Sequence, residues 1–209
     1  MKRILLVAVC GSLLTACGKQ DKDGVQGPTG NVENDFVFVE GGTYQMGASG
    51  KELGLFRWRE ADIMESYIPK TVTVGDFRIS KYEVTLKQFK ELLPDARLSR
   101  KNVDDNAPVF GISWERAVEF CRALNDREGY DGLFIMEILY CYGYDYVLKE
   151  NGNGYRLPTN EEWEYAARGG NRSKGYAFSG GDDVMEVAHF GAGVPCRGGM
   201  YKPNELGIF

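Results

Sequence analysis

The chain has 209 residues, of which 27 are glycine and 12% are aromatic, and its 30 acidic residues outnumber its 25 lysines and arginines. The formal net charge of -5, with no cluster of basic residues, excludes a nucleic-acid-binding surface. The glycine and aromatic content favours a turn-rich α+β domain over a helical bundle.

The chain starts with a segment that has the order of a secretion signal. Two basic residues follow Met1, an apolar run covers residues 4–9, and residues 14–17 read LTAC, ending in Cys17. The apolar run is too short to cross a bilayer of about 30 Å as a helix. We therefore predict cleavage before Cys17. Loss of the two positive charges in residues 1–16 then moves the formal net charge from -5 to -7.

The LTAC segment resembles the lipobox of bacterial lipoproteins, in which the cysteine thiol receives a diacylglycerol and the freed amine a further acyl chain. Two or more chains anchor a protein stably. Gly18 rather than aspartate follows the acceptor, which favours the outer membrane. The resemblance implies a lipid-anchored protein of the bacterial cell envelope with Cys17 as the lipidation site. The alternative is an ordinary signal peptide with an incidental cysteine.

The mature chain is predicted to contain one tether and one domain. Residues 17–34 are rich in glycine, glutamine, aspartate and lysine and contain too few apolar residues to fold, so they form a lipidated flexible tether. Residues 35–209 are long enough for a single domain.

Strands are expected in the first half of this domain. Residues 36–39 and 43–47 are β-prone and flank Gly41-Gly42, which predicts a hairpin. Residues 71–74 and 77–80 flank Gly75-Asp76 and predict a second one. A long loop joins the two hairpins.

Three capped helices are expected after the strands. Thr85 begins a Thr-x-x-Gln capping box, and its helix should stop at Pro94. Ser113 should cap a helix that ends near Gly129. The face of that helix expected to meet the core carries Trp114, Ala117, Val118, Cys121 and Leu124.

The third helix follows a further capping box at Thr159 and should end at Gly169-Gly170, with Trp163 anchoring the core. The pattern of residues 134–148 does not decide between strand and helix.

Five segments, in the right order, resemble the formylglycine-generating enzyme, or sulfatase-modifying factor, family. They read FVFVEGGTYQMGA, DFRISKYEVTLKQF, PVFGISWERAVEFCRALN, NGYRLPTNEEWEYAARGG and KPNELGIF, and they span residues 36–209. The resemblance implies an α+β fold related to C-type lectins, with few regular elements. In the family a segment of the form DMxGNVWEW normally follows PNELG, so we expect the fold to be incomplete at the C-terminus.

The founding enzymes of the family use copper and oxygen, held by a cysteine pair in the C-terminal part, to convert a cysteine to formylglycine. Thiolates select Cu(I). The cysteines that remain in the mature chain, Cys121, Cys141 and Cys196, lack the spacing of that pair, so we assign no catalytic residue. Burial is the favoured interpretation of Cys121. A Cys121–Cys141 or a Cys141–Cys196 bridge stays open.

The sequence also lacks the metal ligands that the other reactions of this family require. Iron-dependent sulfoxide synthases of the family need a histidine cluster, whereas this chain has His189 alone. Calcium is possible by resemblance but is assigned to no residue, since Asp182 and Asp183 are better explained as an acidic turn. Glu161, Glu162 and Glu164 suit a helix start rather than acid–base catalysis. We therefore expect no bound cofactor or metal.

These observations favour a membrane-tethered envelope lipoprotein with a non-catalytic sulfatase-modifying-factor-like domain that serves as a binding or assembly module. Expected partners are membrane lipid through acylated Cys17 and an envelope protein or a carbohydrate ligand. Two alternatives stay open. One is an oxidoreductase of the formylglycine-generating type whose catalytic C-terminal part is missing from this chain, and the other is a truncated gene product that folds poorly.

Overall fold

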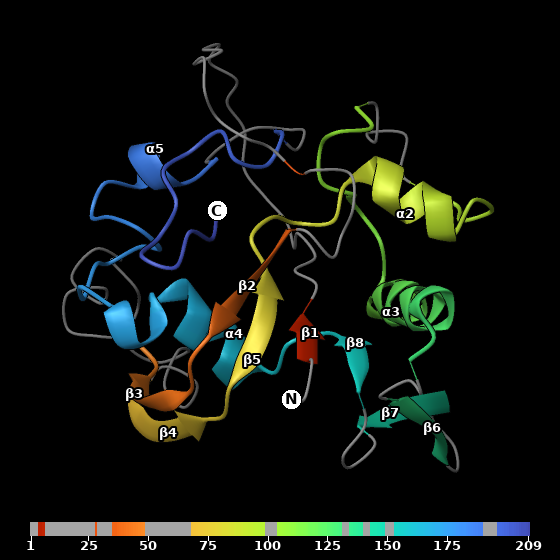
Figure 1. The fold of residues 1–209 in the computed structure, drawn as a ribbon, viewed down its shortest axis with the longest axis horizontal. Coiled ribbons are helices and arrows are strands. Elements are labelled where there is room, and N and C mark those ends of the chain that lie inside the picture. The colour runs from red at the N-terminus through yellow and green to blue at the C-terminus, as the bar shows by residue number, and fades with distance from the viewer. Residues whose placement is uncertain are drawn as a thin grey trace, which may run out of the picture.

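The computed structural model describes residues 4–6, 28, 35–48, 68–98, 104–130, 134–139, 143–148, 153–189 and 196–209. Its strands are β1 (Ile4–Leu6), β2 (Phe36–Val39), β3 (Gly42–Met46), β4 (Lys70–Val74), β5 (Phe77–Ser80), β6 (Phe134–Leu139), β7 (Gly143–Leu148) and β8 (Gly154–Arg156). Its helices are α2 (Leu86–Leu92), α3 (Trp114–Glu128), α4 (Asn160–Ala167), the short 3-10 turn η2 (Gly170–Arg172) and α5 (Val184–Val187) (Figure 1). Among these described residues, no helix has both the length and the apolar character needed to cross a membrane.

The two predicted hairpins are wrong in their pairing. Strand β2 pairs antiparallel with β5, and β3 pairs antiparallel with β4, so the four strands form one long bent ribbon. Gly41 and Gly42 lie at the corner of this ribbon, where the chain bends instead of reversing its direction. The Gly41 N–H donates to Asp76 Oδ1 at 2.8 Å, and a Cβ on Gly41 would lie 2.5 Å from the carbonyl oxygen of Val74. Close approach of two backbones at this corner therefore requires glycine.

The central sheet has four strands in the order β2-β5-β1-β8. Strand β1 runs parallel to both of its neighbours and separates them, as Figure 1 shows. This strand belongs to residues 1–16, whose removal as a signal stays a prediction. A separate antiparallel pair, β6 and β7, resolves the ambiguity of residues 134–148 in favour of strands.

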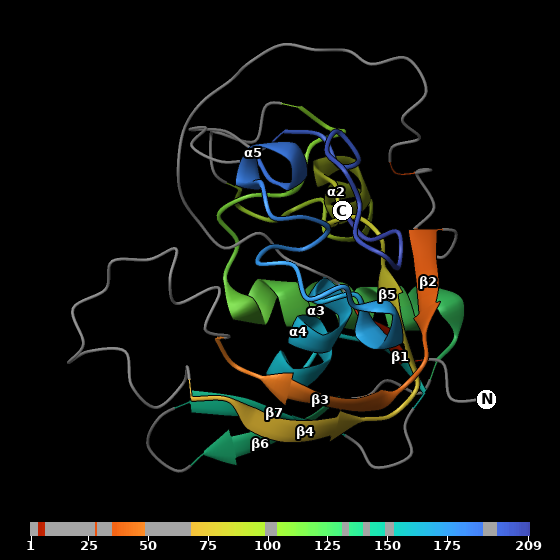
Figure 2. The ribbon, with the colours of Figure 1, turned by 90° about the vertical axis from the view of Figure 1, so that its left-hand side faces the viewer.

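Two hydrophobic clusters lie on opposite faces of the sheet. Phe36 and Val39 of β2 are three positions apart and so point to opposite faces. Phe36 packs with α2, α3 and β8, and Val39 packs with β5 and α4. In Figure 1, α2 and α3 accordingly lie toward β8, and α4 lies toward β2 and the β3–β4 ribbon. The turned view of Figure 2 shows α4 above that ribbon.

The predicted helices and caps are confirmed. Thr85 and Thr159 both make reciprocal capping boxes, and Ser113 accepts the N–H of Arg116. Helix α3 ends at Gly129, whose φ of 73° is the left-handed conformation that favours glycine. The apolar face of α3 is buried as predicted with one exception. Trp114 is 50% exposed, because it stands in the first turn, outside the cluster that α3 covers.

Candidate functional site

The candidate site is built around α4. The carboxylate of Glu162, near the start of this helix, has a structural role. Glu162 completes the capping box by accepting the Thr159 N–H at 2.9 Å. It also accepts both guanidinium nitrogens of the buried Arg156, at 2.6 and 2.7 Å. A carboxylate that is held by a bidentate ion pair and a helix cap is not available as a general acid or base.

Glu164 and Arg168 connect α4 to the end of β3. Their side chains pair at 2.8 Å, one turn apart on the helix. Glu164 also accepts the Gly47 N–H at 2.8 Å, while Arg168 donates to the Gly47 carbonyl oxygen at 2.7 Å. Both backbone groups of one residue are thereby satisfied, and one wall of the site is fixed.

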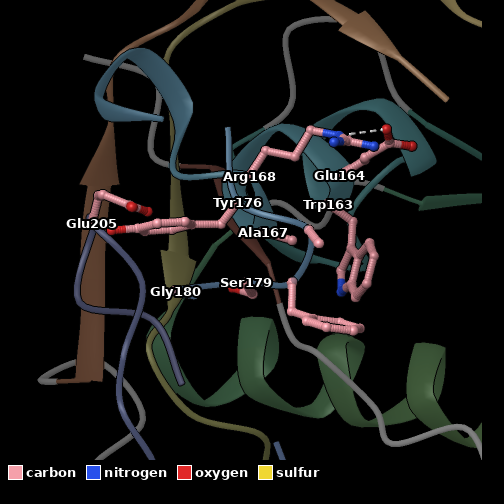
Figure 3. A pocket seen from close by; sticks show the side chains of 10 residues that line it. Trp163, Glu164, Ala167, Arg168, Tyr176, Ser179, Gly180 and Glu205 are labelled. Atoms are coloured by element: carbon pink, nitrogen blue, oxygen red, sulfur yellow. Dashed lines mark hydrogen bonds and ion pairs between the residues drawn. The ribbon is translucent and has the colours of Figure 1, made fainter. Parts of the chain in front are cut away.

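Trp163 was predicted to anchor the core, and this is wrong. Its side chain is 53% exposed, because the capping contacts turn Tyr165 and Ala166 of α4 toward the sheet instead. The indole stands at the edge of a hollow of about 270 Å³ that is also lined by Tyr176, Phe178 and Glu205. Figure 3 shows Trp163 at one end of this hollow and Glu205 at the other.

This hollow continues into two others. A second one, of about 170 Å³, shares Trp163, Ala167 and Ser179 with the first and extends to Phe209. A third, of about 270 Å³, shares Tyr82 and Phe209 with the second and is mainly apolar in its lining. We call this series of three hollows the aromatic groove. It is lined by residues 82–83, 163–164, 166–168, 176–180, 187–189, 196–202, 205 and 208–209, among others.

Asn204 fixes the C-terminal segment that borders the groove. Its amide nitrogen donates to the Ala166 carbonyl at 2.8 Å and to Ser179 Oγ at 3.1 Å. Its side-chain oxygen accepts the N–H groups of Leu206 at 3.0 Å and Ile208 at 3.2 Å. The carbonyls at the end of α4 lack partners within the helix, so this buried amide completes the helix and the segment together.

The groove contains one unsatisfied polar atom. Among the side-chain atoms that the structure describes, Glu205 Oε1 is buried and has no hydrogen-bond partner. Glu205 lines the first hollow, where its carboxylate lies against Gly169. A buried acceptor without a donor costs about 1–3 kcal/mol.

The cysteines do not form a reactive pair within the described residues. Cys121 is a fully buried free thiol on α3, and burial raises its pKa to about 12. A neutral thiol is neither a nucleophile nor a copper ligand. Cys196 lines the third hollow, among residues of the C-terminal segment. Cys141 and Cys17, the predicted lipidation residue, lie outside the described residues.

The remaining candidates have structural partners. Asp182 accepts the Ala177 N–H at 2.9 Å, and Asp183 caps α5 by accepting the Met185 N–H at 2.9 Å. A ring nitrogen of His189 lies 3.2 Å from the Tyr201 hydroxyl. In the part of the chain that the structure describes, no three histidine, cysteine or acidic side chains gather as metal ligands.

The chain forms an α+β domain with two small hydrophobic cores, capped helices and an open aromatic groove. Its loops and its C-terminal segment are arranged around one central sheet. The chain belongs to the family of the sulfatase-modifying factor enzyme 1-like domain, whose sequence model matches residues 23–209. This confirms the resemblance and the fold class expected from the five motifs.

Relatives and solved structures agree with this family. The chain is 32% identical over 236 aligned positions to the chaperone protein LppX of Paenibacillus barcinonensis, covering 99% of this chain and 75% of that protein. The crystal structure of CarF superposes with a TM-score of 0.62 and 25% identity, covering 84% of this chain and 75% of CarF. Treponema denticola variable protein 1 has the same fold, with a TM-score of 0.61, 19% identity and coverage of 83% and 68%.

Proposed function

We propose that the chain is a membrane-tethered envelope lipoprotein whose sulfatase-modifying-factor-like domain binds an extended segment of another envelope protein in the aromatic groove, without catalysis. The observation that carries this proposal is the exposure of Trp163 at the edge of a long, mostly apolar groove. Apolar surface of this kind on a soluble domain marks an interaction site.

A polypeptide suits the groove better than a compact ligand does. The three hollows follow one another, so side chains of an extended chain would enter them in sequence. The relative named a chaperone protein also supports a polypeptide partner. A carbohydrate ligand would need several available polar groups in one hollow, whereas Glu164 and Arg168 in the first hollow are bonded to each other and to Gly47.

We also propose that the domain has no catalytic role. The Cys121 thiol is neutral and inaccessible, Glu162 is held by Arg156 and the helix cap, and Glu164 is held by Arg168. An oxidase of the formylglycine-generating type would reveal itself by copper-dependent oxygen consumption with a cysteine-containing peptide. Robust turnover in that assay would contradict the non-catalytic function.

Replacement of Trp163 tests the groove. The probe is reduced, carboxymethylated α-lactalbumin, a soluble chain that cannot refold, with binding followed by fluorescence anisotropy. Loss of an exposed aromatic anchor at the centre of an interface costs about 2 kcal/mol or more, so Trp163→Ala should weaken binding at least tenfold. Trp114→Ala is the matched control, since Trp114 is equally exposed but lies on α3 outside the groove. Equal affinities for the two variants would exclude the groove as the binding surface.

The tether is tested at Cys17. In bacterial cells that carry a clickable fatty acid, the wild-type chain should be labelled and recovered with the membranes. Cys17→Ser should lose the label and move to the soluble envelope fraction, and Cys10→Ser is the control within the predicted signal. A Cys17→Ser chain that stays labelled would show that the anchor lies elsewhere.

A further inference from the structure

The central sheet contains a slot that is one strand wide. Strand β1 occupies it, with Leu5 level with Arg78 of β5 and with Tyr155 of β8, and both pairings are parallel. Figure 1 shows β1 between these two strands. Its three residues belong to the segment predicted to be removed on export, so β5 and β8 would lose their shared neighbour in the mature chain.

Strand β8 depends on a neighbour in this slot. Asn125 of α3 satisfies one of its edges, since its side-chain oxygen accepts the Tyr155 N–H at 2.6 Å and its amide donates to the Tyr155 carbonyl at 3.0 Å. Successive residues of a strand direct their backbone groups to opposite edges. The backbone groups of Gly154 and Arg156 therefore point into the slot. Both residues are buried, so an empty slot would leave these groups without partners.

Strand β5 adds a chemical requirement at the same level. Arg78 Nε is a buried nitrogen without a hydrogen-bond acceptor among the described side chains. In a parallel pair, residues at one level project to the same face, so a side chain at the level of Leu5 lies between Arg78 and Tyr155. One level further on, the strand lies beside Ile79, which is buried in the second cluster. The slot therefore suits an acidic residue followed by an aliphatic one.

We propose that the slot between β5 and β8 is a strand-addition site, which accepts an extended segment of a partner polypeptide after the leader strand is removed. The incoming strand runs parallel to both neighbours and places an acidic residue level with Arg78 and an aliphatic residue level with Ile79. This inference deepens the proposed function, on which it rests, by giving the polypeptide partner a second and sequence-selective site. Main-chain hydrogen bonds provide the affinity of such additions, and side-chain levels provide the selectivity.

The test begins with the full chain and an opened slot. Leu5→Pro removes a backbone N–H and cannot continue a strand with neighbours on both sides, whereas Leu13→Pro is the same change outside β1. Hydrogen exchange at residues 154–156 should be at least tenfold faster in Leu5→Pro than in Leu13→Pro. Equal exchange in the two variants would overturn the slot.

Peptides then probe the opened slot of the Leu5→Pro chain. The peptide of residues 3–8 should bind and restore protection at residues 154–156, and the same peptide with Leu5→Asp should bind roughly tenfold more tightly, because its carboxylate accepts from Arg78 Nε. The same peptide with Leu5→Pro should not bind, because proline removes a backbone N–H and cannot continue a strand with neighbours on both sides. The further change Arg78→Met should abolish the preference for the aspartate peptide. Equal binding of the wild-type and Leu5→Pro peptides, or an unchanged preference in Arg78→Met, would contradict the proposal.

A second measurement covers failure of Leu5→Pro to fold. A protease site placed in the tether at residues 19–26 of the otherwise wild-type chain allows the leader to be cut from the folded protein. The cut leader should then exchange with the labelled aspartate peptide but not with the Leu5→Pro peptide. Failure of this exchange would overturn strand addition while leaving the binding of unfolded α-lactalbumin by the groove intact, since that binding is measured through Trp163.

Discussion

The surroundings of Cys121 determine the role of its thiol. It is enclosed in the cluster formed by α2, α3 and β8, next to Phe120 and Leu124 of its own helix. Burial disfavours the thiolate and raises the pKa from 9.0 to about 12. The thiol therefore contributes packing rather than chemistry, and its protonation links folding to pH.

We predict that the protein loses stability at alkaline pH in two steps. In the unfolded chain the Cys121 thiol ionises near pH 9, whereas the folded chain keeps the proton to about pH 12. The folded state thus binds more protons in this range, and the free energy of unfolding falls by up to about 1.4 kcal/mol per pH unit. The Tyr44 phenol, whose pKa burial and Glu164 raise to about 12, adds a loss of the same sign above pH 10.

Urea unfolding between pH 7.5 and 9.8 checks the first step. The wild-type midpoint should fall as the pH rises above 9, and Cys121→Ala should flatten this slope while lowering stability at neutral pH by about 1 kcal/mol through lost packing. Tyr44→Phe is the control, because it weakens only the later step, to which Tyr82 and Tyr165 also contribute since burial raises the pKa of both. Parallel pH profiles for the wild type and Cys121→Ala would contradict the assignment.

Among the helices and strands, the sequence predicted local features such as helix caps better than it predicted which strands pair. Capping boxes at Thr85 and Thr159 are read from four residues each, and both were correct. The pairing of β2 with β5 was not predictable, because Gly41-Gly42 fits a reversing turn and a bent corner equally well. Trp163 was misplaced for a similar reason, since the face that α4 buries depends on where the sheet lies.

The groove lay beyond sequence reasoning as well. Its residues come from α4, from the segment after η2 and from the C-terminal segment, which the fold alone brings together. The family motifs did mark two of its parts, because Trp163 lies in the NGYRLPTNEEWEYAARGG segment and Glu205 in KPNELGIF. What the motifs could not show is that the indole is exposed and that Glu205 Oε1 lacks a partner.

The bent ribbon gives a prediction at its corner. A Cβ at Gly41 would meet the Val74 carbonyl oxygen at 2.5 Å and the Gly75 carbonyl carbon at 2.6 Å, and backbone atoms cannot move aside as a flexible side chain can. Gly41→Ala should therefore lower the free energy of unfolding by about 2 kcal/mol or more. Gly75→Ala is the matched control across the corner, where a Cβ would meet nothing within 4 Å. Equal urea midpoints for the two variants would contradict the close approach at Gly41.

In the molecule as a whole, a well-packed scaffold borders the open aromatic groove. Two cores, the buried Arg156–Glu162 pair and the Asn204 amide hold the sheet, α4 and the C-terminal segment together. The aromatic groove, by contrast, leaves Trp163, Met200 and Phe209 partly exposed. The proposed lipid at Cys17 would hold this groove near a membrane surface.

The most direct test of polypeptide binding in the aromatic groove is a hydrogen-exchange footprint of the intact chain with and without reduced, carboxymethylated α-lactalbumin. Backbone amides that become buried beneath a ligand exchange more slowly. We predict slower exchange in residues 163–168, 176–180 and 200–209, with residues 113–130 of α3 unchanged and the footprint lost in Trp163→Ala. An unchanged groove, or protection confined to α3, would contradict the account.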